Sequence, residues 1–483
     1  MDNRAARLIL SLAIGLAPLA LTVSPAAQAR GAVPARHLDK TRPGAVLDPS
    51  FAHGGLLRMP FGSASTTLGT ATRGELLLGG GSGIHILDDR GRPGRAFGSV
   101  GSLRLPPAKG GRFELDGLTV DPEGRLVVLG TSLFPESENP SPYLENGARA
   151  FRPGVVRILR FRPDGHLDPS FGDGGIVETD LGLPPPEGTE GQALGTHPAL
   201  RPTGIAVDPQ GRIVVTGGAT VRLGESCEHD SFAPAGVGAG FVARLAGDGA
   251  PDAVFGNDGL FGGHALGENP LGGETITEPT VAPDGVITYR STDAYPCEPR
   301  QSRYGIGQLT PSGQTRTAFG HRGAMPGPYL ALAGEPDGSV VALAEPGRGG
   351  GEPFRAEVTR IAPDGRPDRS FGRAGHTTLT LDPSLFTTLD SLAVDRRGSI
   401  LVGGTLPTGK EPSAVLLEVS ARGRWEKGFG PHGRVVTKAP GLSLLGPSSL
   451  FFDSKGRLVT LHLHASRGHT GLVVARYLLR SRD

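Results

Sequence analysis

One sequence pattern recurs seven times between residues 47 and 433, and this repetition restricts the fold more than any other feature of the chain. Its clearest copy reads LDPSFGDGG, at 167–175, and every copy keeps the phenylalanine. Self-similarity of this kind indicates a fold with one structural unit per repeat. The seven aromatic residues are Phe51, Phe97, Phe171, Phe255, Phe319, Phe371 and Phe429.

A second pattern, also present seven times, consists of two apolar runs separated by a turn, as in IAVDPQGRIVVTGG at 205–218. Asp, Pro and Gly at the first, second and fourth turn positions favour a type I turn whose last residue can take a positive φ. Branched aliphatic residues on both sides predict a β-hairpin. The fourth-position glycines are Gly74, Gly124, Gly211, Gly285, Gly338, Gly398 and Gly456.

A third apolar strand precedes each later Phe-Gly motif, and a short fourth segment follows it, such as GGIVETD at 174–180. We read one unit as Phe-Gly turn, strand 1, strand 2, hairpin, strand 3, loop and strand 4. Four antiparallel strands per unit, repeated around a ring, make a β-propeller. We therefore predict an all-β, seven-bladed β-propeller with four antiparallel strands per blade. The alternatives are a different blade count or a pair of β-sandwiches.

The two ends of the repeat array complement each other. The last strand, 472–479, has no Phe-Gly motif after it, and the first motif, 47–55, has no strand before it. We therefore expect the chain ends to meet and close the ring, and we expect the closed ring to be a monomer.

The residues quoted above resemble a known family. LDPSFGDGG together with VDPQGRIVVTGG is similar to the delta-60 repeat of secreted bacterial proteins, and the hairpins also resemble NHL-like blades. The resemblance covers residues 44–479. The copies at 92–101, 314–323 and 424–433 depart from LDPSF but keep Phe-Gly. The resemblance implies a propeller and no particular activity.

The N-terminus has the features of a signal peptide. Arg4 and Arg7 precede an apolar stretch from Leu8 to Val23, and Ala27-Gln28-Ala29 fits the cleavage pattern. The alternative, a membrane anchor, needs a longer apolar run without Pro18. We expect a signal peptide at 1–29, a linker at 30–43, and a propeller at 44–483. The protein should be secreted, without membrane insertion.

Charge argues against one class of partner. The chain has 49 Lys+Arg and 48 Asp+Glu, a formal net charge of +1, so nothing favours nucleic acid. In an oxidising compartment its two cysteines, Cys227 and Cys297, can form one disulfide. They fall in the same type of loop of blades 3 and 4, so we predict that they pair.

The long insertions indicate where a partner binds. They lie at 131–154, 181–202 and 219–240, in connections that leave one face of blades 2 to 4. Function concentrates on loops held by a rigid scaffold. These and the neighbouring blade-4 loop carry aromatic and acidic residues, which we take as candidate partner-binding residues, although a solvated surface without a partner is the alternative. The candidates are Phe134, Tyr143, Tyr295, Tyr304 and Glu228.

Three further patterns have the spacing of known chemical sites but lack part of what such a site needs. His462 and His464 share a strand face, with His469 across a loop, which is a zinc spacing, but no acidic residue between 454 and 482 supports it. The segment GTLPTGK at 404–410 has phosphate-loop spacing but no helix after it. Asp116 and Asp390 precede strand 2, where the other blades have Thr203, Thr277 and Ser448. That is not a ring of carboxylates.

The sequence thus favours a secreted binding or scaffold propeller that recognises a protein or glycan through its long-loop face. The alternative is an extracellular propeller enzyme, such as a hydrolase, lyase or dehydrogenase. We predict no catalytic residue, metal or cofactor.

Overall fold

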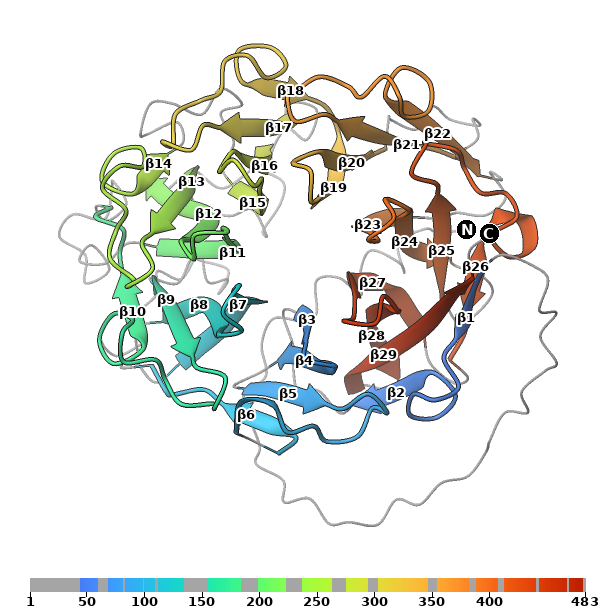
Figure 1. Cartoon of the computed structure of the whole chain (residues 1–483), viewed down its shortest axis with the longest axis horizontal. Coiled ribbons are helices and arrows are strands. Elements are labelled where there is room, and N and C mark those ends of the chain that lie inside the picture. The colour runs from blue at the N-terminus through green and yellow to red at the C-terminus, as the bar shows by residue number, and fades with distance from the viewer. Residues whose placement is uncertain are drawn as a thin grey trace, which may run out of the picture.

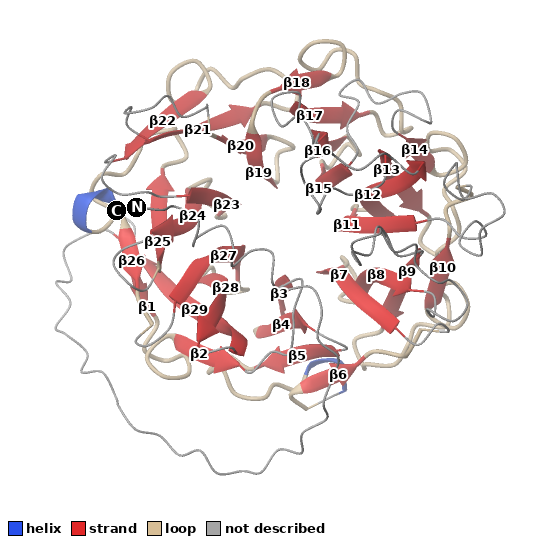
Figure 2. Cartoon of the chain, turned by 180° about the vertical axis from the view of Figure 1, so that it is seen from behind, coloured by secondary structure: helices blue, strands red, loops and turns tan. Residues whose placement is uncertain are grey.

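In the computed structural model, seven four-stranded sheets are arranged as blades around a central axis (Figure 1). The structure describes residues 44–59, 68–80, 83–98, 100–108, 112–133, 154–183, 199–222, 237–262, 275–293, 303–345, 354–381, 388–406, 412–439, 443–466 and 469–480. Strands dominate these residues (Figure 2), and the helical elements among them are the 3-10 turns η1 (Ala96–Gly98) and η3 (Pro431–Gly433). The prediction of an all-β, seven-bladed propeller is confirmed.

The blades follow the order of the chain, and each is numbered from its innermost strand. Blade 1 contains β3 (Leu68–Thr72), β4 (Glu75–Gly80), β5 (Gly83–Leu87) and β6 (Ser102–Arg104). Blade 2 contains β7 (Arg112–Val120), β8 (Leu126–Leu133), β9 (Gly154–Phe161) and β10 (Ile176–Thr179). Blade 3 contains β11 (Ala199–Val207), β12 (Ile213–Arg222), β13 (Val237–Leu245) and β14 (Leu260–Gly262). A single parallel bridge, Ala199 to Gly154, joins blades 2 and 3.

The remaining blades repeat this arrangement. Blade 4 contains β15 (Thr275–Val281), β16 (Ile287–Asp293), β17 (Arg303–Leu309) and β18 (Ala324–Pro326). Blade 5 contains β19 (Tyr329–Gly334), β20 (Val340–Ala344), β21 (Phe354–Ile361) and β22 (His376–Leu381). Blade 6 contains β23 (Thr388–Val394), β24 (Ile400–Leu406), β25 (Ser413–Val419) and β26 (Val435–Thr437). Blade 7 contains β27 (Ser443–Phe452), β28 (Leu458–Ser466) and β29 (His469–Arg480), with β1 (Gly44–Leu47) and β2 (Leu56–Met59) along its outer edge.

The sheets are offset by one strand from the unit read in the sequence. The strand after each Phe-Gly turn does not start a new blade but completes the preceding one, as β10 does by pairing antiparallel with β9. The reason is local: the Phe-Gly turn is a tight connection that folds the chain back onto the strand just finished. The connection that crosses to the next blade comes after this outermost strand.

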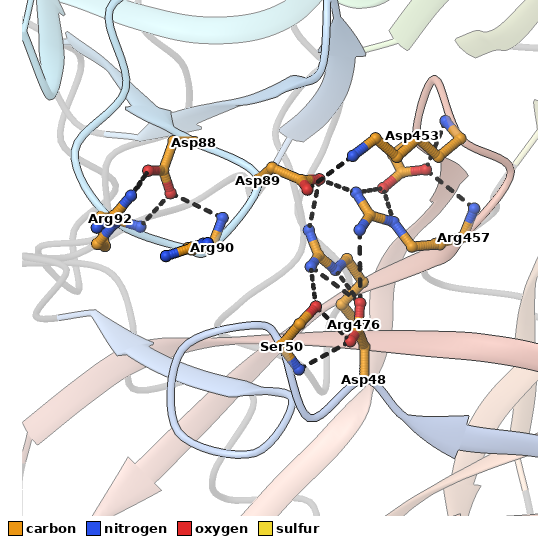
Figure 3. A network of polar contacts seen from close by, with 10 residues as sticks. Asp48, Ser50, Asp88, Asp89, Arg90, Arg92, Asp453, Arg457 and Arg476 are labelled. Carbon is orange, nitrogen blue, oxygen red and sulfur yellow. Dashed lines mark hydrogen bonds and ion pairs between the residues drawn. The ribbon is translucent and has the colours of Figure 1, made fainter.

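The chain ends close the ring as expected. β29 pairs with both β1 and β2, with Leu47 opposite Tyr477 and Leu56 opposite Ala475. A polar network reinforces this seam (Figure 3). Arg476 forms an ion pair with Asp48, and Asp89 of blade 1 pairs with Lys455 and Arg457 of blade 7. Blade 7 is thus tied both to the N-terminal strand and to blade 1.

The repeated phenylalanines are buried, as predicted for residues that fill the wedge between sheets. Each is at most 4% exposed. In three blades an arginine on the neighbouring strand lies over the ring: Arg160 over Phe171, Arg244 over Phe255 and Arg476 over Phe51, all within 4.5 Å of the ring centroid. The arginine also pairs with the Asp of the same motif, Asp168 in blade 2 at 2.8 Å. A cation–π contact and an ion pair together fix the motif.

In several blades the Phe-Gly turn is also hydrogen-bonded to the next blade. The N–H of Gly172 donates to the carbonyl of Asp248 in blade 3, and the N–H of Gly256 donates to that of Ser312 in blade 4. The predicted hairpin glycines all have positive φ, for example 80° at Gly124 and 78° at Gly211. No helix in the described part of the chain is long and apolar enough to cross a membrane.

Candidate functional site

The two faces of the ring have connections of different length. One face carries the hairpin turns between the two inner strands of each blade and the Phe-Gly turns between the two outer strands. The opposite face carries the connections from β8 to β9, β12 to β13 and β16 to β17, and the crossovers to the next blade. We call these the turn face and the long-loop face. The predicted grouping of long connections of blades 2 to 4 on one face follows from this strand order.

Most of the predicted partner-binding residues lie outside the described residues. This holds for Phe134, Tyr143, Tyr295 and Glu228, and also for Cys227 and Cys297. Tyr304 is described: it is the second residue of β17, on the long-loop face, and it is 39% exposed. A large aromatic side chain exposed at the base of a long connection is available to a partner.

On the turn face, the hairpin side chains are occupied by the fold itself. The Oδ1 atom of Asp121 accepts the backbone N–H groups of Glu123 and Arg125, and its Oδ2 atom accepts the Nε–H of Arg125 at 2.6 Å. Asp208 with Arg212, and Asp453 with Arg457, repeat this arrangement. These carboxylates stabilise turns, and both of their oxygen atoms already accept hydrogen bonds from the turn.

Six of the seven innermost strands, which surround the axis (Figure 1), contain a β-bulge, at the same repeat position in five of them and one residue later in blade 4. A bulge redirects the side chain of the extra residue and often occurs beside functional sites. In blade 4 the register shifts between Thr277 and Thr280, so the bulge contains Glu278. The equivalent residues in the other bulged blades are Asp116, Thr203, Leu330, Asp390 and Ser448.

This corrects the expectation drawn from the sequence. Asp116 and Asp390 do not precede their strands but lie inside them, and in blade 4 the bulge holds Glu278, the residue after Thr277. Three of the six bulge residues are therefore carboxylic acids. Glu278 has a structural task, because it pairs with Arg290 at 3.1 Å and accepts the N–H of Leu332 from blade 5 at 2.7 Å.

Asp116 has the most perturbed carboxyl group of the bulges. Burial is the main cause that raises its pKa to about 7, and the nearby Glu114 raises it further. A hydrogen bond from Thr131, at 2.8 Å, and the charge of Arg201 oppose this rise. A carboxyl group with a pKa near neutrality can exchange a proton at physiological pH, as a general acid or base must.

Asp390 in blade 6 shows a smaller effect of the same kind. Solvent reaches its side chain, yet the surrounding strands remove much of its hydration, and its pKa rises to about 6. Among the hollows of the described residues, one of about 140 Å³ and one of about 620 Å³ are not lined by Asp116 or Asp390. The smaller one lies where Ala282 and Val286 replace the Asp–Arg pair of other hairpins.

The histidines have structural surroundings. His462 is fully buried, and its Nε2 atom lies 2.6 Å from the hydroxyl of Thr460. Burial and the charge of Arg58 lower the pKa of His464, whose ring covers Gly471. Among the described residues, no group of three His, Cys, Asp or Glu side chains could hold a metal ion. The side chain of His469 lies outside this description.

A pairing in blade 5 resembles part of a catalytic triad. The Nδ1 atom of His376 lies 3.0 Å from the hydroxyl of Thr359 and 3.1 Å from the carboxylate of Glu357. A triad needs the nucleophile and the carboxylate on opposite ring nitrogens. Because both partners here share one nitrogen, the arrangement cannot relay a proton between them.

These features define the chain as a seven-bladed β-propeller with a tight-turn face, a long-loop face and perturbed carboxyl groups near the axis. No family model matches the chain, and no curated protein matches it either. The polysaccharide lyase Uly1 matches with 11% identity over 86% of this chain and 90% of that one, at a TM-score of 0.45. A protein of unknown function from Dyadobacter fermentans matches with 13% identity over 78% and 97%, at 0.40.

A gluconolactonase from Xanthomonas campestris matches with 17% identity over 72% of this chain and 90% of that one, at a TM-score of 0.30. Values this low carry no argument about activity. The propeller is established by its own strand pairing, and the resemblance to the delta-60 repeat family stays a prediction.

Proposed function

We propose that this protein is an exported binding propeller that recognises a protein or glycan through the long-loop face of blades 2 to 4. The observation that carries the proposal is the contrast between the two faces. Hairpin carboxylates on the turn face, such as Asp121 and Asp208, are bound to their own turns, whereas the long-loop face exposes Tyr304 at the end of the β16–β17 connection.

A binding screen with paired variants tests this proposal. The exported protein is screened against arrays of neutral and acidic glycans and against candidate secreted proteins. Tyr143→Ala combined with Tyr295→Ala should weaken binding of any ligand found and leave the thermal midpoint unchanged. The matched control is Glu123→Ala with Gln210→Ala on the turn face. If the control pair abolished ligand binding and the tyrosine pair did not, the site would lie on the turn face and the proposal would be wrong.

Export is part of the proposal. The pattern Ala27-Gln28-Ala29 places the cleavage site after Ala29. N-terminal sequencing of protein recovered from the medium should therefore begin at Arg30. Recovery of exported chain that still starts at Met1 would contradict a cleaved signal peptide.

One observation favours the alternative of an extracellular enzyme, such as a hydrolase, lyase or dehydrogenase. Asp116 combines a raised pKa with a position beside the axis and with Arg201 nearby. An enzyme using it would lose activity in Asp116→Asn and keep it in Asp364→Asn, a change at an exposed turn residue. Elemental analysis of the exported protein would add a second readout, because a stoichiometric metal would support catalysis.

A further inference from the structure

Basic side chains accumulate on the Phe-Gly turns of blades 5 and 6. We call this set the basic rim. All of its members are exposed, and all come from two consecutive copies of one repeat. The set consists of Arg366, Arg369, Arg373, Arg422, Arg424 and Lys427.

The same repeat positions carry no Arg or Lys in blades 2 and 3, although blade 1 has Arg92 and Arg95 at two of them. Counted from the motif phenylalanine, Arg366, Arg369 and Arg373 stand five before, two before and two after it. The corresponding residues of blade 2 are His166, Pro169 and Asp173, and those of blade 3 are Ala250, Ala253 and Asn257. With a net charge of +1 for the whole chain, the basic rim is a local concentration rather than a general excess of charge.

The two halves of the rim form one continuous surface. The N–H of Gly372 donates to the carbonyl of Arg422 at 2.9 Å, and the guanidinium of Arg360 donates to the carbonyl of Ala421. The Phe-Gly turn of blade 5 therefore lies directly against the 420–423 turn of blade 6. Arg373 and Arg422 are consequently neighbours across the seam between the blades.

Few of these charges are used within the fold. Arg424 pairs with Glu426 at 2.9 Å. In the part of the chain that the structure describes, Arg369 and Arg373 form no ion pair with a carboxylate. Exposed guanidinium groups without an internal partner can form paired hydrogen bonds with carboxylates of a ligand.

The rim also contains the only tryptophan of the chain. Trp425 packs on one side against the hydrophobic core between blades 5 and 6 and remains partly exposed. The ammonium of Lys427 lies 5.7 Å from its ring centroid. A partly exposed aromatic ring next to cationic groups suits a sugar that carries an acidic substituent, because the exposed part of the ring contacts apolar C–H groups while the cations bind the acid.

We propose that the basic rim binds an acidic polysaccharide whose sugars carry carboxylates. The site lies on the turn face and is distinct from the long-loop face of the proposed function, so either can fail without the other. A long nucleic acid fits less well, because phosphate binding favours a basic domain and this chain is nearly neutral, with Asp164, Asp173 and Asp248 on the same face of blades 2 and 3.

Polygalacturonate is the probe, and dextran of similar length is the neutral control. Affinity is measured over a series of salt concentrations with the full exported protein. Arg369→Gln, Arg373→Gln and Lys427→Gln combined should weaken polygalacturonate binding roughly tenfold, the size expected when three exposed ionic contacts are lost, and should flatten the salt dependence. Dextran should not bind at all.

The control is Arg92→Gln with Arg95→Gln in blade 1, at the repeat positions of Arg366 and Arg369; it removes two exposed arginines outside the basic rim, of which Arg92 pairs with Asp88. This pair should bind polygalacturonate like the native chain. Equal losses in the control and in the triple variant, or no loss in the triple variant, would overturn the assignment of the site to blades 5 and 6.

Two further binding experiments test the class of ligand. Trp425→Leu should weaken polygalacturonate binding and Trp425→Tyr should retain it, provided that the thermal midpoints show both variants to be folded. Unchanged binding in Trp425→Leu would overturn the sugar assignment, because attraction between charges needs no ring. Single-stranded DNA bound more tightly than polygalacturonate through the same arginines would overturn it as well.

Discussion

Arg476 and Asp48 stand 428 positions apart in the chain, yet the guanidinium Nη2 atom of Arg476 lies 2.9 Å from the carboxylate Oδ2 atom of Asp48. The pair joins β29 to the turn after β1, which is the seam where the two ends of the chain close the ring. Both side chains are almost completely buried, and Arg476 also covers the ring of Phe51. The ring is thus closed by the same Arg–Asp–Phe unit that occurs in blades 2 and 3.

Replacing this arginine should destabilise the ring strongly. Arg476→Met removes the closest positive charge from the buried Asp48 and leaves Arg457, 3.6 Å away, as its ion-pair partner, so the loss should be at most the ~3–5 kcal/mol typical of a broken buried ion pair. Urea unfolding of the purified protein measures the loss. Arg244→Met breaks the equivalent Arg–Asp pair of blade 3 and serves as the comparison, because that pair does not lie where the chain ends meet. An unfolding free energy equal to that of the native chain would show that Arg476 does not hold the seam.

Acid should weaken the same seam through Asp89. Burial raises the pKa of its carboxyl group, but hydrogen bonds from Arg457 and Lys455 outweigh burial and lower the pKa to about 2. A carboxylate whose pKa is depressed in the folded state contributes stability above its ordinary pKa of 3.8. This stability is lost as the pH falls from about 4 towards 2.

Thermal midpoints between pH 2 and pH 7 test this expectation. The native chain should lose more stability between pH 4 and pH 2 than Asp89→Asn, which has no carboxylate to protonate. At pH 7 the variant should be the less stable of the two. Parallel pH profiles for the two proteins would contradict a contribution from Asp89.

Blade 6 should respond to pH in the opposite direction. Glu418 occupies the position in the third strand of blade 6 at which four other blades have an arginine. These arginines are Arg160, Arg244, Arg360 and Arg476. Burial is the main cause that raises the pKa of Glu418 to about 7, and the charges of Glu426 and Asp395 raise it further. Because the folded-state pKa lies above the ordinary value of 4.5, the contribution to stability is complete below pH 4.5 and is lost as the pH rises through 7.

Glu418→Gln mimics the protonated acid at every pH. Its thermal midpoint should match that of the native chain near pH 4.5 and exceed it at pH 8. Asp364→Asn, at an exposed turn residue of blade 5, controls for the general loss of a negative charge and should not reproduce the difference. A Glu418→Gln variant no more stable than the native chain at pH 8 would contradict the raised pKa.

The wedge phenylalanines should be equivalent in energy as well as in position. Phe171 and Phe371 are both fully buried, in blades 2 and 5. Truncating a buried Phe to Ala typically costs about 3–5 kcal/mol. Phe171→Ala and Phe371→Ala should therefore lower the unfolding free energy by similar amounts in urea titrations. Val254→Ala, a change at a side chain that is 72% exposed, should have little effect.

The repeat predicts the ring well because each unit contains its own turn chemistry. The Asp-Pro-x-Gly hairpins and the Phe-Gly turns are local signals, and both form as expected. The blade offset was missed because a strand's partner is not a local property: β10 is followed by β11 in the chain but pairs with β9. The Arg–Asp unit was also missed, although a sequence signal exists, since Arg160, Arg244 and Arg360 each precede the motif Asp by eight residues.

Site prediction was weaker because it depends on register. Glu278 has a φ of 53°, and the bulge it creates displaces the alignment with Asp116 by one residue. A glutamate in this left-handed conformation is uncommon, so counting along the strand selects Thr277 instead. Burial raises the pKa of Asp116 and Glu114 raises it further, whereas Thr131 and Arg201 oppose the rise. These three neighbours come from three strands of two blades.

Finally, we predict a disulfide between Cys227 and Cys297. Both residues lie outside the described residues, but the strands that flank them are described. Cys227 belongs to the connection between β12 and β13 of blade 3, and Cys297 to that between β16 and β17 of blade 4. These connections leave adjacent blades on the long-loop face, so a bond between them would tie two loops of the proposed binding surface together.

Such a bond should stabilise both the fold and the binding surface. Closing a loop of this length contributes on the order of 3–4 kcal/mol. Mass spectrometry of non-reduced exported protein should find the two peptides linked, and Cys227→Ser should lower the thermal midpoint as much as the double variant with Cys297→Ser. Two free thiols in the exported protein would rule the bond out. Because fixing loops before binding reduces the ordering cost, reduction should also weaken any ligand of the long-loop face and leave polygalacturonate binding to the basic rim unchanged.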